Sequence, residues 1–282
     1  MTQNAASTSL VPILIAAAEN LEPAETRLLS DDFAQHMLPV PLRAVVRRPL
    51  GRRLLRAAMD REGPGIWNSL ACRKRYFDDR TGAAIAAGIE SVVVLGAGLD
   101  TRAMRLAAPA GIPSFEVDQP VITERKRQRI NLPDKVIQVP IDFETDDLRT
   151  ALRTHGYDAG SKTLFLWEGV TQYLTERAVR DTLTALAEAR AGSILVFSHV
   201  RQDFIDGTDL GDCAPTHRRF VGRNPLWQFG LQPEDVAGLL IEYGWIELEQ
   251  VGGPEYAARF LTPIGRAATV PDLERCVTAA KR

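Results

Sequence analysis

Two glycines and an aspartate in this sequence have the spacing of a nucleotide-binding site. Gly96 and Gly98, separated by Ala97, directly follow the apolar run 92–95. Glycines permit a tight turn and let the backbone approach a ligand closely. Asp118 comes 20 residues after Gly98, where a carboxylate can accept hydrogen bonds from a ribose diol. Together they predict a site for a nucleoside-like ligand, although Asp118 could instead only cap the next helix.

Acidic residues also follow the third and fourth predicted strands. Asp142 and Phe143 stand at the end of the run 136–141, and Glu168 and Gly169 follow the next apolar run. An aspartate beside an aromatic ring suits an adenine amino group, although Asp142 could also form an Asx turn. Open α/β sheets bind ligands at the carboxyl ends of their strands, so these acids and the glycine turn are expected at one edge of the sheet.

A sheet of strands alternating with helices is predicted to position these residues. The predicted strands are 92–95, 113–117, 136–141, 163–167 and 193–198. Helical spacing separates them, as at 121–130 and 176–190. This alternation requires right-handed crossovers and predicts a doubly wound, mostly parallel α/β fold. A helix at 233–243 and two closing strands, 245–251 and 273–279, complete the chain with a terminal antiparallel pair.

The residues before the sheet form a predicted helical cap. Apolar residues recur at helical spacing in 11–20, 24–36, 50–60 and 66–87. We expect one α/β domain, with a helical N-terminal cap over 1–88, a core over 89–282 and a cap insertion near 202–225. Five arginines lead into and decorate the third helix: Arg47, Arg48, Arg52, Arg53 and Arg56. They form a solvated helix face or meet an anionic substrate or partner, and both interpretations stay open.

The composition is that of a soluble globular protein. The 282 residues include 45% hydrophobic residues and carry a formal net charge of −2, which gives no global attraction for nucleic acid or an anionic membrane. The apolar run 10–18 is too short to span a bilayer, and no Lys or Arg precedes it. We therefore expect a cytoplasmic protein. The three cysteines lie far apart and indicate no metal site.

Four runs give the sequence a resemblance to a known family. They are Arg-Tyr-Phe-Asp-Asp at 75–79, Leu-Gly-Ala-Gly-Leu-Asp-Thr-Arg at 95–102, Phe-Glu-Val-Asp-Gln-Pro at 115–120 and Trp-Glu-Gly-Val-Thr-Gln-Tyr-Leu at 167–174. In combination they resemble the leucine carboxyl methyltransferase family, including its actinobacterial and polyketide O-methyltransferase members. The resemblance implies a Rossmann-like class I methyltransferase fold, a seven-stranded sheet with a reversed terminal strand, and S-adenosyl-L-methionine as cofactor.

The resemblance also implies roles for individual residues. Asp118 would hold the ribose, Asp142 and Phe143 would meet the adenine, and Glu168 would line the site near the methionine portion. An arginine before the Tyr-Phe pair would bind the methionine carboxylate; we favour Arg75 over Arg73. The complete expected cofactor set is Arg73, Arg75, Gly96, Ala97, Gly98, Asp118, Gln119, Asp142, Phe143, Glu168 and Gly169.

A methyl sulfonium is an activated donor, so positioning of an acceptor oxygen can carry the catalysis. A carboxylate acceptor is ionised at neutral pH and requires no general base, whereas a hydroxyl must lose a proton. His199, which follows a predicted strand, is the histidine we nominate as that base. By resemblance, Tyr173 lies near the acceptor, although a packed tyrosine is an equal alternative.

Two other functions share parts of this pattern. An NAD-dependent oxidoreductase has the same turn and acid, but Thr101 replaces the third glycine of its fingerprint and no Tyr-x-x-x-Lys pair follows the fourth strand. A protein that binds S-adenosyl-L-methionine without turnover is the second alternative. We favour methyl transfer to an oxygen of a small molecule, such as a polyketide-type metabolite. The sequence leaves the acceptor and any homo-oligomeric state open.

Overall fold

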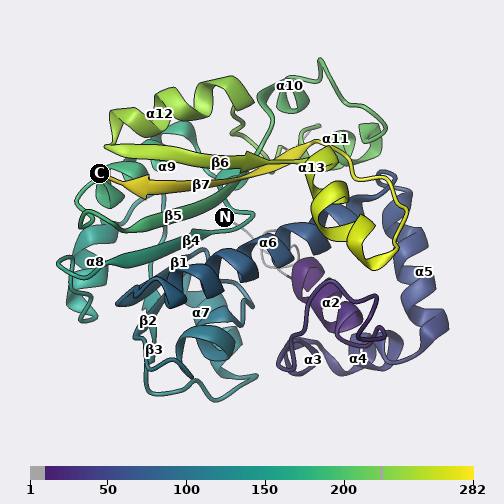
Figure 1. Cartoon of the computed structure of the whole chain (residues 1–282), viewed down its shortest axis with the longest axis horizontal. Coiled ribbons are helices and arrows are strands. Elements are labelled where there is room, and N and C mark those ends of the chain that lie inside the picture. Colours follow the sequence, from purple (N-terminus) through teal and green to yellow (C-terminus); the bar gives the residue numbers. More distant parts are fainter. Residues whose placement is uncertain (1–9, 223–224) are drawn as a thin grey trace.

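The computed structural model describes residues 10–222 and 225–282, and its centre is one seven-stranded sheet (Figure 1). The strand order is β3-β2-β1-β4-β5-β7-β6. The strands are β1 (Ser91–Leu95), β2 (Ser114–Asp118), β3 (Val136–Pro140), β4 (Thr163–Trp167), β5 (Ile194–Val200), β6 (Trp245–Val251) and β7 (Glu274–Lys281). The first five strands pair in parallel, and β7 is antiparallel to both β5 and β6. The seven-stranded sheet with an antiparallel terminal strand is confirmed.

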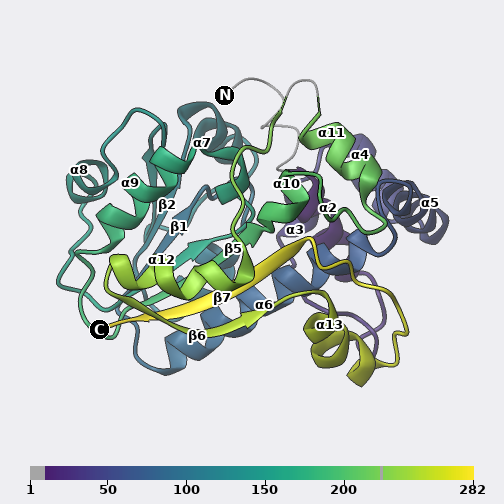
Figure 2. The ribbon, with the colours of Figure 1, turned by 90° about the horizontal axis from the view of Figure 1, so that it is seen from above.

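Helices cover both faces of this sheet because alternate strand residues point to opposite sides. Val92 and Val94 belong to one core cluster, and Val93 and Leu95 belong to a second. The first cluster includes residues of α2 and α6, and the second includes residues of α8, α9 and α12. Figure 2 shows α6 on one side of the sheet and α8, α9 and α12 on the other. The longer helices are α2 (Leu10–Glu19), α4 (Val40–Val46), α5 (Pro49–Asp60), α6 (Ile66–Ala86), α7 (Pro120–Arg127), α8 (Leu148–Thr154), α9 (Glu176–Leu186), α11 (Ala214–Phe220) and α12 (Val236–Glu242).

The helix predicted over 24–36 is wrong, since only α3 (Ala34–Met37) is helical there. Side-chain carboxylates bind the backbone of this segment instead. Glu19 accepts a hydrogen bond from the Leu28 backbone N–H at 3.2 Å, and Asp31 accepts one from Ala34 at 3.0 Å. Such side-chain bonds compete with helical hydrogen bonding, and the helical spacing of apolar residues does not reveal them.

Glu19 fixes the C-terminal end of α2 to the rest of the molecule. Its side chain is fully buried and accepts a hydrogen bond from Trp67 Nε1 at 3.1 Å. It also forms ion pairs with Arg266 at 2.8 Å and Arg56 at 3.3 Å. A buried carboxylate requires such partners, so α2 is tied at this end to α5, α6 and the segment before β7.

The segment after the glycine turn contains a five-residue π-helix, Ala103–Ala107, rather than a long α-helix. Across the described ranges, none of the helices has the length and apolarity needed to cross a bilayer.

Candidate functional site

The glycine turn follows β1 as predicted and needs glycine at its first position. Gly96 has a φ of +65° and Gly98 a φ of +49°, in the left-handed region that disfavours residues with a Cβ. A Cβ on Gly96 would also lie 2.4 Å from Cγ2 of Val170. The β1–π-helix connection is therefore packed against the segment after β4, and the two form adjoining walls of one site.

Asp118, at the end of β2, holds this turn in place. Its Oδ2 accepts a hydrogen bond from the Gly98 backbone N–H at 2.6 Å, and its Oδ1 accepts one from Gln119 at 2.7 Å. Burial raises the pKa of Asp118, and these two N–H donors counteract part of that shift. Each carboxylate oxygen keeps further lone-pair capacity for a ligand hydroxyl.

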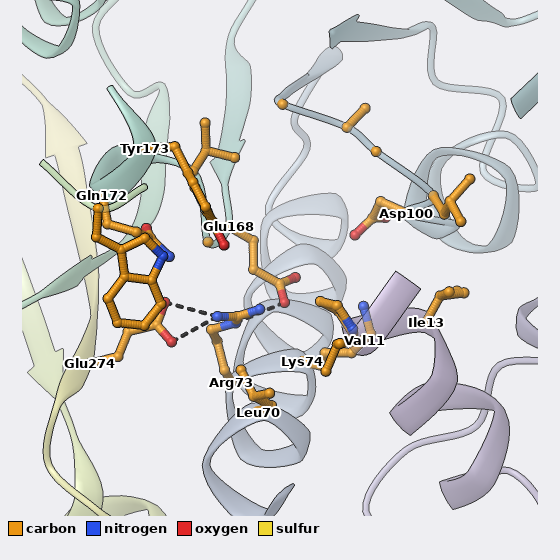
Figure 3. Close-up of a pocket in the computed structure, with 18 of the residues that line it drawn as sticks. Val11, Ile13, Leu70, Arg73, Lys74, Asp100, Glu168, Gln172, Tyr173 and Glu274 are labelled. Carbon is orange, nitrogen blue, oxygen red and sulfur yellow. Dashed lines mark hydrogen bonds and ion pairs between the residues drawn. The ribbon is translucent and has the colours of Figure 1, made fainter. Parts of the chain in front are cut away.

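A cavity of about 390 Å³ opens at this edge of the sheet. Ten of the predicted site residues are among the described residues that line it: Arg73, Gly96, Ala97, Gly98, Asp118, Gln119, Phe143, Glu168, Gly169 and Tyr173. Figure 3 shows Tyr173, Glu168 and Arg73 converging on the space, with Val11 and Ile13 of α2 opposite. A volume of this size is typical of a small-molecule or cofactor site.

Arg73, on α6, joins two carboxylates in the cavity wall, one directly after β4 and one at the start of β7. Its Nε donates to Glu168 at 3.0 Å and its Nη1 to Glu274 at 2.7 Å (Figure 3). Ser198 also donates to Glu274, at 2.8 Å. Burial alone would raise the pKa of Glu168, but nearby Arg102, Lys74 and Arg73 outweigh it and hold that pKa well below its usual range. Glu168 is therefore an anion at neutral pH.

Arg102 forms a second buried ionic junction beside the first. Its guanidinium donates to Asp78 at 2.7 Å, to Glu168 at 2.5 Å and to Asp100. The Arg102 side chain is 1% exposed. Its remaining nitrogen, Nη2, donates to the backbone carbonyl of Lys74 at 3.0 Å. Arg102 thus bridges three carboxylates near the cavity, and Arg105 and Arg73 supply further positive charge to Asp78 and Glu168.

Lys74 contributes a buried ammonium group to the cavity wall. It lines the cavity, is only 5% exposed, and its ammonium has no hydrogen bond or ion pair among the described residues. Its charge lowers the pKa values of Glu168 and Asp100 through space. A buried ammonium without a close partner is costly, and an anionic ligand group would satisfy it.

The other end of the cavity is apolar and aromatic. It is lined by Met59, Ile66, Leu70, Tyr173, Phe220, Trp227 and Leu273. The Trp227 ring stacks on Phe220 at 4.6 Å and meets the Tyr173 ring edge-on at 6.4 Å. Gln172 Oε1 and Trp227 Nε1 are buried in this wall without a hydrogen-bond partner in the described structure. This end suits an apolar molecule with few polar groups.

The structure places Arg75 outside the cavity, which corrects our preference between the two arginines. Its Nε pairs with Asp79 at 2.7 Å, its Nη1 donates to the Leu28 carbonyl, and its side chain is 43% exposed. Arg73 and Lys74 line the cavity instead. Residues two apart on a helix differ by about 200° in direction, so only one of the arginines can face inward.

Asp142 lies beside the cavity lining rather than in it. Its Oδ1 accepts a hydrogen bond from the Glu144 backbone N–H at 3.0 Å, which is the Asx-turn alternative left open by the sequence. Phe143, the next residue, lines the cavity. An adenine contact by Asp142 stays a prediction.

His199 is placed away from the cavity, inside the sheet, which removes it as the base for a hydroxyl acceptor. It is fully buried on β5, and its ring nitrogens are within hydrogen-bonding distance of the Val200 carbonyl at 3.2 Å and Gln250 Oε1 at 3.4 Å. Burial lowers the pKa of His199 to about 4. The sequence pattern placed it after a strand, whereas β5 extends through it to Val200.

His199 should make the protein sensitive to acid. Because its folded pKa lies below the unfolded value of about 6.5, its contribution to stability is lost as the pH falls from 6.5 towards 4. Between pH 7 and 5 this amounts to about 2 kcal/mol of unfolding free energy. Urea unfolding at pH 7 and pH 5 measures this change. Between the two pH values, the unfolding free energy of His199→Gln should fall by about 2 kcal/mol less than that of the unsubstituted protein. Equal acid losses in both proteins would contradict the assignment.

Sequence reasoning missed four residues of the site: Lys74, Arg102, Glu274 and Gln172. Lys74 and Arg102 stand within or beside the motif runs, but spacing alone does not say which side chains turn inward. Glu274 reaches the cavity only because β7 inserts between β5 and β6. No local signal marks that contact.

Comparisons with known proteins identify the relatives of this chain. The family model for leucine carboxyl methyltransferase matches residues 9–187. A protein of Mycolicibacterium paratuberculosis named "Putative S-adenosyl-L-methionine-dependent methyltransferase" is 36% identical over 273 residues, which cover 90% of this chain and 86% of that protein.

Two solved structures share the fold. A DUF574 family protein from Streptomyces avermitilis has a TM-score of 0.59 and 14% identity, and the match covers 98% of this chain and 97% of that one. An O-methyltransferase family protein from Burkholderia thailandensis has a TM-score of 0.52 and 12% identity, and the match covers 81% and 61% of the two chains. At such low identity these structures support the architecture alone.

Proposed function

The chain belongs to the leucine carboxyl methyltransferase family and uses S-adenosyl-L-methionine, and we propose that it methylates an oxygen atom of a small apolar acceptor. The observation that carries this proposal is the continuity of the cavity. One cavity joins the glycine turn and Asp118 to the aromatic chamber of Tyr173 and Trp227. Donor and acceptor can therefore be bound side by side with water excluded between them.

The polar end of the cavity fits the donor. Asp118 accepts the ribose hydroxyls, and Phe143 packs beside the adenine. Lys74 supplies the unpaired ammonium for the methionine carboxylate, and Arg73 lines the same wall. Glu168, ionised and near Lys74, receives the methionine ammonium group. The bound cofactor supplies an activated methyl group, and these side chains fix where that group points.

The apolar end orients the acceptor. Leu70 and Leu273 pack against its carbon skeleton, and Tyr173 and Trp227 offer ring surfaces. Burial of apolar surface supplies the binding free energy, at about 25 cal/mol per Å². Gln172 Oε1 can accept a hydrogen bond from an acceptor group, because it has no partner within the described residues.

An acceptor carboxylate suits this cavity better than a hydroxyl. No histidine is among the described residues that line it. Glu168 and Glu274 are already engaged by Arg73, which makes them weak proton acceptors. A carboxylate needs no proton removed at neutral pH. Tyr173 then acts by contact with the acceptor and removes no proton.

Methyl transfer from a labelled cofactor tests the proposal. Purified protein is incubated with methyl-labelled S-adenosyl-L-methionine and apolar carboxylic acids or size-matched phenols, and labelled ester is the expected product. Lys74→Met should lower kcat/KM for the cofactor roughly ten- to hundredfold, because one charge-assisted hydrogen bond is lost. Lys162→Met, an exposed lysine before β4, should leave it unchanged. Label on nitrogen or sulfur, or no transfer to any acceptor, would contradict the proposal.

A further inference from the structure

The outer side of α4 and α5 forms a basic and apolar surface that the site does not use. We propose that this surface docks the protein onto an anionic lipid bilayer. The residues of this α4–α5 surface are Val40, Val45, Arg47, Arg48, Leu50, Arg53 and Leu54. None of them is among the described residues that line the cavity.

The aliphatic side chains of the α4–α5 surface are unusually exposed. Val40 is 74% exposed, Leu50 67% and Leu54 63%. Leu50, Arg53 and Leu54 are spaced i, i+3 and i+4, so they share one face of α5. No residue of α5 falls in the buried class. Large apolar side chains gathered on one exposed face mark an interaction site.

The charges of the α4–α5 surface have one sign and lack ionic partners. Arg47, Arg48 and Arg53 are exposed and form no ion pair among the described residues. On the inner side of α5, by contrast, Arg52 and Arg56 are paired with Glu22. Residues 1–9 and 223–224 contain no Asp or Glu that could neutralise the outer arginines. The surface is therefore complementary to an anionic partner.

A bilayer fits this surface better than a folded protein does. α5 forms an outer edge of the molecule in both ribbon views, with no other element beyond it (Figures 1 and 2). Protein partners concentrate their binding energy in aromatic anchors that fill pockets, and the α4–α5 surface has neither aromatics nor a pocket. An interfacial helix inserts leucine and valine side chains at the headgroup boundary and places its arginines at the lipid phosphates. The α4–α5 surface has these residue types.

The proposal does not rest on the transfer reaction, because vesicle binding is measured without cofactor or acceptor. Full-length protein is sedimented with vesicles of phosphatidylglycerol and phosphatidylcholine at low and high salt. We expect binding that rises with the phosphatidylglycerol fraction and falls with salt. A triple variant should bind the vesicles more weakly: it carries Arg47→Gln, Arg48→Gln and Arg53→Gln. Its partition coefficient between vesicles and solution should fall about a hundredfold, since each arginine contributes about fivefold. Leu50→Ser with Leu54→Ser should weaken binding at both salt concentrations.

A matched triple variant controls for overall charge. Arg149→Gln, Arg153→Gln and Arg177→Gln remove three arginines from α8 and α9, and should leave vesicle binding within a few-fold of the unsubstituted protein. Equal losses in the two triple variants, or no binding to phosphatidylglycerol vesicles, would overturn the proposal. Salt-sensitive binding to polyglutamate without vesicle binding would assign the surface to an acidic polypeptide. A dimer dissociated by the two leucine substitutions would assign it to a second copy of the chain.

Discussion

Asp118→Ala is expected to weaken the binding of S-adenosylhomocysteine about a hundredfold or more. The variant loses the charged acceptor for the ribose hydroxyls, and each hydrogen bond to a charged group is worth about 1.5–3 kcal/mol. It also frees the backbone N–H groups of Gly98 and Gln119, which Asp118 now binds at 2.6 and 2.7 Å. Isothermal titration calorimetry on the purified variant measures the loss directly.

Two further variants separate the effects of Asp118. Asp118→Asn keeps one oxygen acceptor and nearly the same shape, so it should bind with intermediate affinity. Asp142→Ala should have a smaller effect, because the predicted adenine contact of Asp142 is a single hydrogen bond and Asp142 is not among the described residues that line the cavity. Unchanged affinity in Asp118→Ala, with the fold intact by circular dichroism, would show that the cofactor does not occupy this end of the cavity.

Arg102→Met is expected to lower the free energy of unfolding by about 3–5 kcal/mol, because removing one member of a buried ionic cluster leaves its partners uncompensated. Here the partners are Asp78, Asp100 and Glu168, all of which pair with a guanidinium that is 1% exposed. Urea denaturation at neutral pH measures the change. Because those carboxylates become protonated at low pH, the difference between the two proteins should shrink as the pH falls.

Arg75→Met is the matched control for Arg102→Met. Arg75 lies on α6 beside the same region, but its side chain is 43% exposed and its pair with Asp79 lies at the surface. Exposed pairs of this kind contribute at most about 1 kcal/mol. Similar losses in the two variants would mean that the Arg102 junction contributes no special stability.

The sheet and the glycine turn were predictable because their signals are local. The run at 92–95, the glycines after it and Asp118 each depend on neighbouring residues, and the seven-stranded sheet is confirmed. The π-helix after the turn was not predicted, since five residues are too few to show a period.

The side chains that meet in the cavity depend on contacts distant in the sequence, which the sequence patterns do not contain. Arg73 reaches Glu274, 201 residues away. The choice between Arg73 and Arg75 depends on how α6 is rotated against the sheet, and helical spacing allows more than one rotation. The error at His199 concerned where a strand ends. The pattern ended the strand at residue 198, whereas β5 continues to Val200 and buries His199 within it.

The anchoring of α2 by Glu19 has a mechanical consequence for the cavity. Val11 and Ile13, in the first half of this ten-residue helix, form part of the cavity wall, whereas Glu19 fixes the opposite end. Between these two ends, Ile13 to Ala18 are buried in the main hydrophobic core. The position of this part of the cavity wall therefore depends on the ion pairs of Glu19 at the far end of the same helix, so the loss of a partner such as Arg266 would be felt at the cavity as well as at that end.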